Sequence, residues 1–193
     1  MSYVLKGEFS GREVAIKVLK VSGGKAEEYF NELFKEASNL VTLSQNPNIV
    51  QVYAVDVNKH VIEEILRGNT KLYLTNPPMI VMEFMKGGSL YSLLKDDAFF
   101  YSSSWEKAIY KAIASVAEAL AHIHRNGYVH MDVKPQNVFM DRKPSQPADL
   151  LSVEFKLGDL GSAVRINAKP VQLTPEYAPP EVLIEKAKPY MDV

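Results

Sequence analysis

The alternation of hydrophobic and polar positions predicts a small sheet in the first part of the chain. Ser2–Lys6 has the pattern of a strand, Ser10 and Gly11 that of a tight turn, and Val14–Leu19 that of a second strand. Three further runs are typical of strands: Ile49–Val57, Lys71–Leu74 and Met79–Phe84. We therefore expect a five-stranded antiparallel sheet within residues 1–85.

Helical periodicity follows in two places. After Gly23 and Gly24, apolar residues share one stripe and predict a helix that packs on the sheet: Tyr29, Phe30, Leu33, Phe34, Ala37, Leu40 and Val41. A longer helix is predicted from a capping-box spacing at Ser103–Glu106 to a stop at Asn126 and Gly127. Its expected buried face consists of Ile109, Ile113, Val116, Leu120 and Ile123.

The change from strand to helix patterns falls at Lys86–Gly88, where the two glycines are typical of a hinge. We therefore expect an α+β fold with a sheet-rich small lobe, residues 1–85, and a mainly helical large lobe, residues 86–193. A chain of 193 residues has the size of one domain.

Charge and composition narrow the possible partners. Lys and Arg number 22 against 23 Asp and Glu, so a net charge of -1 provides no long-range attraction to nucleic acid or anionic lipid. The 47% of hydrophobic residues suffice for a core, and the absence of cysteine excludes disulfides and thiol chemistry. No apolar signal segment opens the chain at Met1–Glu8, and no run approaches a membrane span. We expect an intracellular protein with neither a nucleic acid nor a membrane as its partner.

The residues with the strongest chemical signal lie in His130–Asn137. Phosphoryl transfer needs a carboxylate to orient a hydroxyl, a cation near the transferred phosphate and an oxygen ligand for a metal. Asp132, Lys134 and Asn137 offer one of each at fixed offsets. Asp, Lys and Asn are also common in turns, but this combination favours a catalytic loop.

The stretch from His130 to Asn137 resembles the catalytic loop H-R-D-L-x-x-x-N of the eukaryotic protein kinase family. The other family motifs have counterparts in the same order: Val14–Lys17 resembles V-A-I-K, Asp159–Gly161 resembles D-F-G, and Thr174–Glu181 resembles the segment that ends in A-P-E. The resemblance covers essentially all 193 residues and implies a two-lobed protein kinase fold.

The resemblance also implies roles for individual residues. Asp132, Lys134 and Thr174 would act in catalysis, while Asn137 and Asp159 would hold Mg²⁺. ATP would be contacted by Val4, Ala15, Lys17, Glu36, Met82, Glu83, Met85 and Phe139. Met82 has the gatekeeper place, and the substrate would be a protein.

Three questions stay open at this stage. Glu36 is the favoured partner of Lys17, since Leu40 would then take a hydrophobic-spine place, but Glu32 lies one turn away and is an alternative. Lys134 resembles serine/threonine kinases and favours transfer to serine or threonine, with dual specificity open. A catalytically impaired, kinase-like binding module is the alternative function.

Several positions depart from the family pattern. Met131 replaces an arginine that binds activation-loop phosphate in many relatives, so we expect activity to be independent of phosphorylation of that loop. His130–Asp132 together with Gly158–Gly161 is similar to Wee-type kinases, whereas Gly7–Val14 is similar to the tyrosine-kinase-like group.

Both ends predict an incomplete domain. Val4 aligns with the valine that closes the glycine-rich loop, which would place that loop upstream of Met1. Asp192 resembles the buried aspartate that opens the central helix of the large lobe, and the arginine that would pair with Glu181 lies beyond it. We therefore expect a fragment, with a natural short form as the alternative, and in either case an exposed apolar face in the large lobe.

Overall fold

The computed structural model describes residues 2–19, 26–170 and 173–193, without the side chains of residues 2, 19, 26–30, 32, 33 and 36. The chain divides into two compact units. Unit 1 comprises Met1–Thr42 and Gln51–Phe84, and unit 2 comprises Leu43–Val50 and Met85–Val193.

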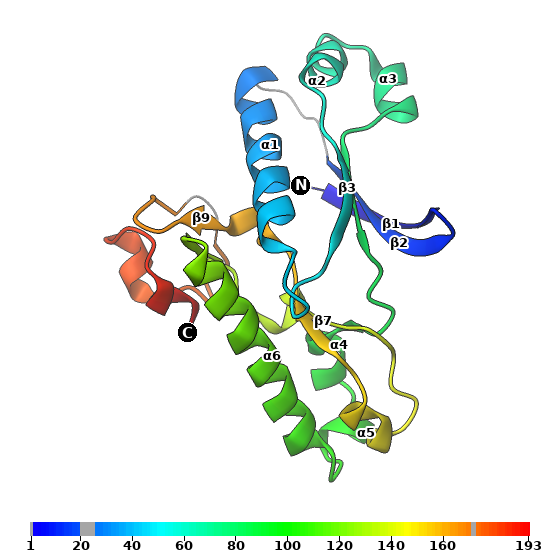
Figure 1. Ribbon diagram of the computed structural model, residues 1–193, viewed down its shortest axis with the longest axis vertical. Coiled ribbons are helices and arrows are strands. Elements are labelled where there is room, and N and C mark those ends of the chain that lie inside the picture. The colour runs from blue at the N-terminus through cyan, green and yellow to red at the C-terminus, as the bar shows by residue number, and fades with distance from the viewer. Residues whose placement is uncertain (1, 20–25, 171–172) are drawn as a thin grey trace. The chain divides into compact units, whose positions relative to one another are not determined.

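Unit 1 is built on an antiparallel sheet of four strands in the order β1-β2-β4-β3 (Figure 1). The strands are β1 (Ser2–Phe9), β2 (Arg12–Leu19), β3 (Val52–Asp56) and β4 (Met79–Glu83). Ser10 and Gly11 both have positive φ at the turn between β1 and β2, as the sequence predicts for a tight hairpin. Val14, Val18, Ile80 and Val81 are buried, so β2 and β4 contribute core residues of this unit.

The prediction of a fifth strand at Lys71–Leu74 is wrong. These residues lie in helix α3 (Thr70–Thr75), which follows helix α2 (Lys59–Leu66). Asn58 accepts hydrogen bonds from the amides of His60 and Val61, and Asn69 accepts one from Leu72. These two caps satisfy amides that a helix start leaves unpaired, so they favour helix over strand in a short apolar run.

Helix α1 (Ala26–Leu43) forms where the periodicity predicts it, but its predicted stripe is only partly correct. Ala37 and Leu40 are buried, whereas Phe34 and Val41 are exposed. Tyr29, Phe30 and Leu33 lie outside the residues whose side chains are described. The buried face continues instead through Leu43, because residues 37, 40 and 43 follow one another at a spacing of three, which keeps them on one side of a helix.

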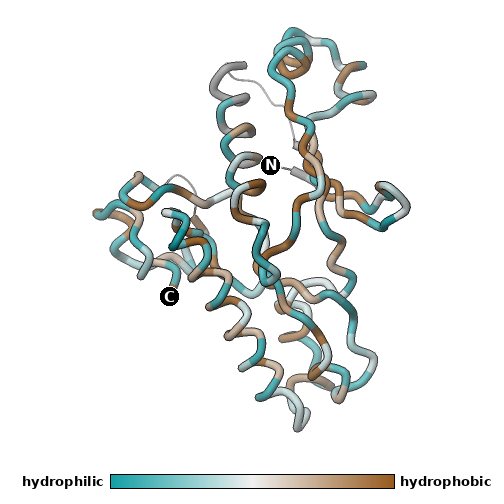
Figure 2. Tube along the Cα trace, in the orientation of Figure 1, coloured by the Kyte–Doolittle hydropathy of each residue, from teal (hydrophilic) through white to brown (hydrophobic). Residues whose placement is uncertain are grey.

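Unit 2 is organised around helix α6 (Trp105–Arg125). Figure 2 shows polar and apolar positions alternating along this helix. Its buried residues are Ala108, Ala112, Ala119, Leu120 and Ile123. Ile113 is 59% exposed, so that part of the predicted face is wrong: small alanines, which the stripe of larger apolar residues omits, form the contact.

The predicted capping box at the start of α6 is also absent. Ser104 is the N-cap, but its backbone is already helical and its side chain makes no capping hydrogen bond. The Trp105 amide instead donates to the Ser102 carbonyl at 3.1 Å. The predicted end of the helix at Asn126 and Gly127 is confirmed, with Gly127 at φ 80.

The rest of unit 2 consists of short elements around α6. A three-stranded sheet has the order β5-β7-β8, and β6 pairs with β9. The strands are β5 (Gly88–Ser89), β6 (Tyr128–Val129), β7 (Val138–Met140), β8 (Phe155–Leu157) and β9 (Val164–Arg165). The helices are α4 (Leu90–Leu94) and α5 (Asp97–Phe100), with 3-10 turns η1 (Pro135–Asn137), η2 (Pro147–Leu151), η3 (Leu160–Ser162), η4 (Pro180–Leu183) and η5 (Pro189–Asp192).

Residues Leu43–Val50, which the sequence assigns to the small lobe, belong to unit 2. The Val50 amide donates to the Leu157 carbonyl at 2.9 Å, and the Leu157 amide donates to the Asn48 carbonyl at 2.8 Å. The Asn48 side chain donates to Glu118 on α6 at 2.7 Å. These bonds fasten the segment after α1 to β8 and α6.

Leu183 and Ile184 in unit 2 are 85% and 87% exposed. None of the helices in the described parts of the chain is long and apolar enough to cross a membrane.

Candidate active site

The loop from His130 to Asn137 connects β6 to η1 and β7, so strands fix both of its ends. β6 pairs with β9 and β7 pairs with β8, as residues 129 with 164 and 138 with 157. Met131 has φ 67, a left-handed conformation that costs a residue with a Cβ about 1–3 kcal/mol unless its surroundings enforce it. The turn before Asp132 is therefore held by contacts outside the loop.

Asp192 supplies those contacts. Its side chain has no exposed surface, and its Oδ2 and Oδ1 atoms accept hydrogen bonds from the amides of His130 and Met131, each at 2.8 Å. Nε2 of His124, on α6, lies 2.8 Å from the same Oδ2. The sequence singled out Asp192 by resemblance alone, and it missed His124, which is linked to the loop only through the fold.

Asp132, Lys134 and Thr174 form a closed triangle of hydrogen bonds. Thr174 Oγ1 donates to Asp132 Oδ1 at 2.5 Å, and Lys134 Nζ donates to Thr174 Oγ1 at 2.7 Å. Lys134 Nζ also lies 2.8 Å from Asp132 Oδ2. Thus a carboxylate, an ammonium group and a hydroxyl meet, although Thr174 lies far along the chain.

Burial raises the pKa of Asp132, but hydrogen bonds from Lys134, Thr174 and Asn137 and the charge of Lys134 outweigh it and hold that pKa below its ordinary value. Asp132 is therefore a carboxylate at neutral pH. It can accept a hydrogen bond, and then a proton, from a hydroxyl placed beside it.

Asn137 connects Asp132 to the segment that carries Asp159. Nδ2 of Asn137 donates to the Asp132 carbonyl and to Oδ2, at 2.8 and 2.9 Å. The Gly158 amide donates to the Asn137 carbonyl at 2.8 Å, and Nε2 of His130 lies 3.1 Å from the Gly158 carbonyl. Gly158 is thus bonded to the first and the last residue of the loop, His130 and Asn137. Asp159 follows it directly and has φ 55.

His130 is fully buried. Burial lowers the pKa of His130, and this effect outweighs the opposing influence of Asp192, Gly158, Asp159 and Asp132. The imidazole is therefore neutral at pH 7. Its Nδ1 accepts a hydrogen bond from the Asp132 amide at 3.2 Å, which leaves the Nε2 proton for Gly158.

Four candidate ATP-binding residues lie on one face of the unit 1 sheet. Val4 is opposite Lys17, and Ala15 is opposite Met82, in antiparallel pairs. Residues opposite each other in an antiparallel pair point to the same face of the sheet, and so do residues two apart on one strand. Ala15 and Lys17 are two apart on β2, so all four residues share one face. Ala15 is buried, Lys17 and Met82 are half-buried, and Val4 is 61% exposed.

The remaining candidates are distributed between the units. The Glu83 amide donates to the Gln51 carbonyl at 2.8 Å in unit 1, while Met85 and Phe139 are half-buried residues of unit 2. The Phe139 ring lies against Gly158. The side chains of Glu36 and of the alternative Glu32 lie outside the described residues.

Comparisons with known proteins show the family of the chain. The serine/threonine-protein kinase ArnS of Sulfolobus acidocaldarius is 42% identical over 98% of this chain, and the Citron rho-interacting kinase of Rattus norvegicus is 30% identical over 93% of it. A probable serine/threonine-protein kinase of Dictyostelium discoideum is 31% identical over 84% of the chain. The chain spans 33%, 8% and 10% of the lengths of these three relatives. A family model described as the protein kinase domain matches residues 2–193, and the chain therefore belongs to the protein kinase domain family.

Proposed function

We propose that this chain transfers the γ-phosphoryl group of ATP to serine or threonine hydroxyls of a protein substrate. The observation that carries the proposal is the closed triangle of Asp132, Lys134 and Thr174. It places a deprotonated carboxylate next to a cation, which is the arrangement that phosphoryl transfer to a hydroxyl requires. The names of the three relatives, all kinases, point to the same reaction.

In this reaction the substrate hydroxyl oxygen forms a bond to the γ-phosphorus, while the bond from that phosphorus to the β–γ bridging oxygen breaks. Asp132 orients the hydroxyl and accepts its proton, and ADP leaves with the bridging oxygen. Lys134 faces the negative charge that develops on the transferred group. Thr174 fixes both side chains through its two hydrogen bonds.

The donor atoms of unit 2 fit Mg²⁺. Both hydrogens of the Asn137 side-chain amide point to Asp132, so its side-chain oxygen, Oδ1, is the atom that can face a cation. Asp159 adds a carboxylate. Mg²⁺ prefers such oxygen ligands and is usually held by one or two carboxylates together with substrate phosphates. When bound, Mg²⁺ would neutralise phosphate charge during transfer.

The proposal assigns ATP contacts in both units. In unit 1, Val4 and Ala15 would contact adenine, Lys17 would pair with the α- and β-phosphates, Met82 would be the gatekeeper, and Glu83 would contact adenine through its backbone. Glu36 would be the acidic partner of Lys17. In unit 2, Met85 and Phe139 would complete the adenine contacts. The two units would then be the small and large lobes of one kinase domain.

A transfer assay tests the proposal. The chain is incubated with Mg²⁺ and γ-labelled ATP on a library of serine- and threonine-containing peptides. We expect incorporation in the wild type and a loss of about 100-fold or more in Asp132→Asn, which removes the proton acceptor. Asp97→Asn is the matched control, since Asp97 is an exposed residue of α5 and the same change there removes the same charge.

A thermal-melting measurement, combined with the transfer assay, separates the kinase from a kinase-like binding module. A rise in the melting temperature with Mg²⁺-ATP reports nucleotide binding independently of transfer, by linkage. Binding without incorporation in the wild type would favour the binding module. Incorporation that is equal in the wild type and in Asp132→Asn would contradict the assigned role of Asp132.

A further inference from the structure

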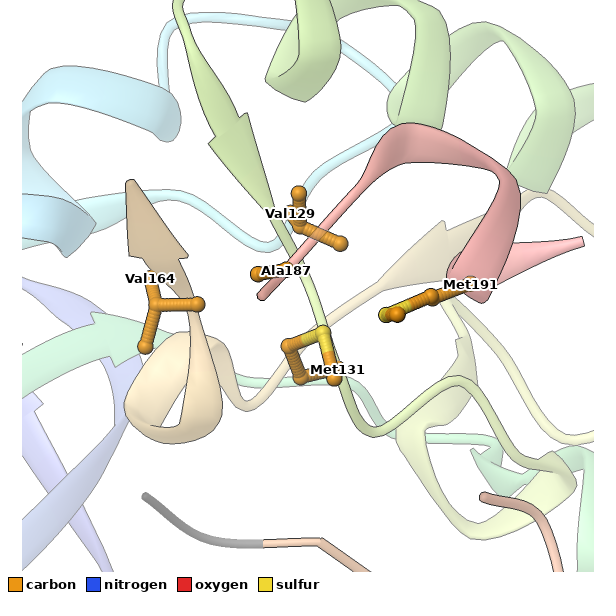
Figure 3. Close-up of a cluster of buried hydrophobic side chains, with 5 residues drawn as sticks. All are labelled: Val129, Met131, Val164, Ala187 and Met191. Atoms are coloured by element: carbon orange, nitrogen blue, oxygen red, sulfur yellow. The ribbon is translucent and has the colours of Figure 1, made fainter. Parts of the chain in front are cut away.

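Met131 lies where an arginine stands in many members of this family, and its surroundings are apolar. Its side chain is 6% exposed and belongs to a buried cluster with Val129, Val164, Ala187 and Met191 (Figure 3). Ile166, Ala168 and Val182 pack against this cluster and are partly buried. A guanidinium group at position 131 would be removed from water here without a partner of opposite charge among these residues.

The five clustered side chains come from three separate stretches of the chain. Val129 and Met131 belong to β6 and the residues after it, Val164 to β9, and Ala187 and Met191 to the last described stretch (Figure 3). The cluster therefore joins the catalytic loop to residues on both sides of Thr174.

Backbone hydrogen bonds close the same segment at its base. The Asn167 amide donates to the Ala187 carbonyl, and the Ala187 amide donates to the Ala168 carbonyl, both at 2.9 Å. The chain from 168 to 187 is thus a loop whose two ends are paired beside the cluster. Thr174, inside this loop, is the residue that contacts Asp132 and Lys134.

Two adjacent residues, Met191 and Asp192, provide apolar and polar contacts to the catalytic loop. Met191 packs in the cluster with Met131, while Asp192 accepts the amides of His130 and Met131. The left-handed turn at Met131 directs its side chain into the cluster and leaves Asp132 at the triangle with Thr174 and Lys134.

We propose that Met131 is a positioning residue whose apolar side chain fastens both ends of the segment 164–187 to the catalytic loop, and so holds Thr174 against Asp132 without a phosphate group. The inference rests on the proposed kinase function. In this chain, buried apolar contact performs the docking that an arginine with a phosphorylated side chain would otherwise provide.

Chymotrypsin cleavage after Tyr177 tests the docking independently of activity. Tyr177 lies inside the loop and is 45% exposed, and cleavage requires the loop to open locally. We expect cleavage at this bond to be about tenfold faster in Met131→Ala and in Val164→Ala, and close to the wild-type rate in Met131→Leu, which keeps the apolar volume.

Leu150→Ala is the matched control, because Leu150 is fully buried but lies in η2, which packs on α6. It should lower the melting temperature without accelerating cleavage after Tyr177. Equal acceleration in Leu150→Ala and Met131→Ala would overturn the inference, since the effect would then be general destabilisation.

The kinetic arm uses protein that has been treated with phosphatase and shown by intact mass to carry no phosphate. We expect the treated wild type to retain its rate, and Met131→Ala to lose about tenfold in kcat with KM for ATP changed less than about twofold. Met131→Leu should restore kcat. A treated wild type that loses activity, and regains it on phosphorylation, would overturn the inference. A wild type that never transfers phosphate refutes the proposed function, whereas the cleavage assay still decides the docking role.

Discussion

Replacement of Asp192 by alanine should destabilise unit 2 strongly. The change removes the acceptors of two buried amides, those of His130 and Met131, and the partner of His124. A buried donor left without a partner costs about 1–3 kcal/mol, so the two amides together cost about 2–6 kcal/mol. The left-handed turn at Met131 also loses the contacts that enforce it. Native proteins have total unfolding free energies of about 5–15 kcal/mol, so the loss expected for Asp192→Ala is a large fraction of the total.

The chain has a single tryptophan, Trp105, at the start of α6 in unit 2, so its fluorescence during urea unfolding reports on this unit. Asp192→Asn keeps one acceptor oxygen and should lose less stability than Asp192→Ala. Asp97→Ala, an exposed change, should stay within about 0.5 kcal/mol of the wild type. A loss below about 1 kcal/mol in Asp192→Ala would refute the reasoning, because the amides would then have other partners.

Three further predictions concern the neighbours of the triangle. Thr174→Val keeps the side-chain shape but removes a hydrogen bond that lowers the pKa of Asp132. The kcat should therefore fall about tenfold, and the acidic limb of the kcat–pH profile should move to higher pH. Thr174→Ser should retain the wild-type kcat and the wild-type pH profile. Since burial lowers the pKa of His130, the unfolded chain binds a proton there at a pH where the native chain does not. Stability should therefore decrease as the pH falls from the ordinary imidazole range toward the native pKa. Urea midpoints measured across this pH range should show that His130→Asn lacks the part of the pH dependence that comes from His130. In Gly158→Ala a Cβ would lie 2.9 Å from the Phe139 ring and 3.1 Å from a Val50 methyl, so urea unfolding should show a loss of about 1–3 kcal/mol; an unchanged midpoint would contradict the packing described here.

The sequence predicted those parts of the fold that depend on local pattern. Alternation over Val14–Leu19 and Met79–Phe84 identified β2 and β4, and Asn126 with Gly127 identified the end of α6. It failed at Lys71–Leu74, where four residues fit a strand or a helix and the cap at Asn69 selects the helix. It also failed at Ile113, because alanines allow α6 to pack through a neighbouring face.

The candidate site was predictable where roles depend on short spacing. Asp132, Lys134 and Asn137 lie within one loop, and the structure places all three in one hydrogen-bonded group. The contacts of Thr174 and Asp192 span 42 and 61 or more residues of chain, so only the fold brings them to the loop. The apolar environment of Met131 is likewise a tertiary property: the sequence revealed the missing arginine but not the cluster that replaces it.

The claim that Asp132 activates a serine or threonine hydroxyl is tested most directly by single-turnover transfer from γ-labelled ATP to three peptides that differ only in a central serine, threonine or tyrosine. We predict label on the serine and threonine peptides, a loss of about 100-fold or more in Asp132→Asn, and wild-type rates in Asp97→Asn. Label on the tyrosine peptide alone, or transfer that is equal with and without the Asp132 carboxylate, would contradict the account.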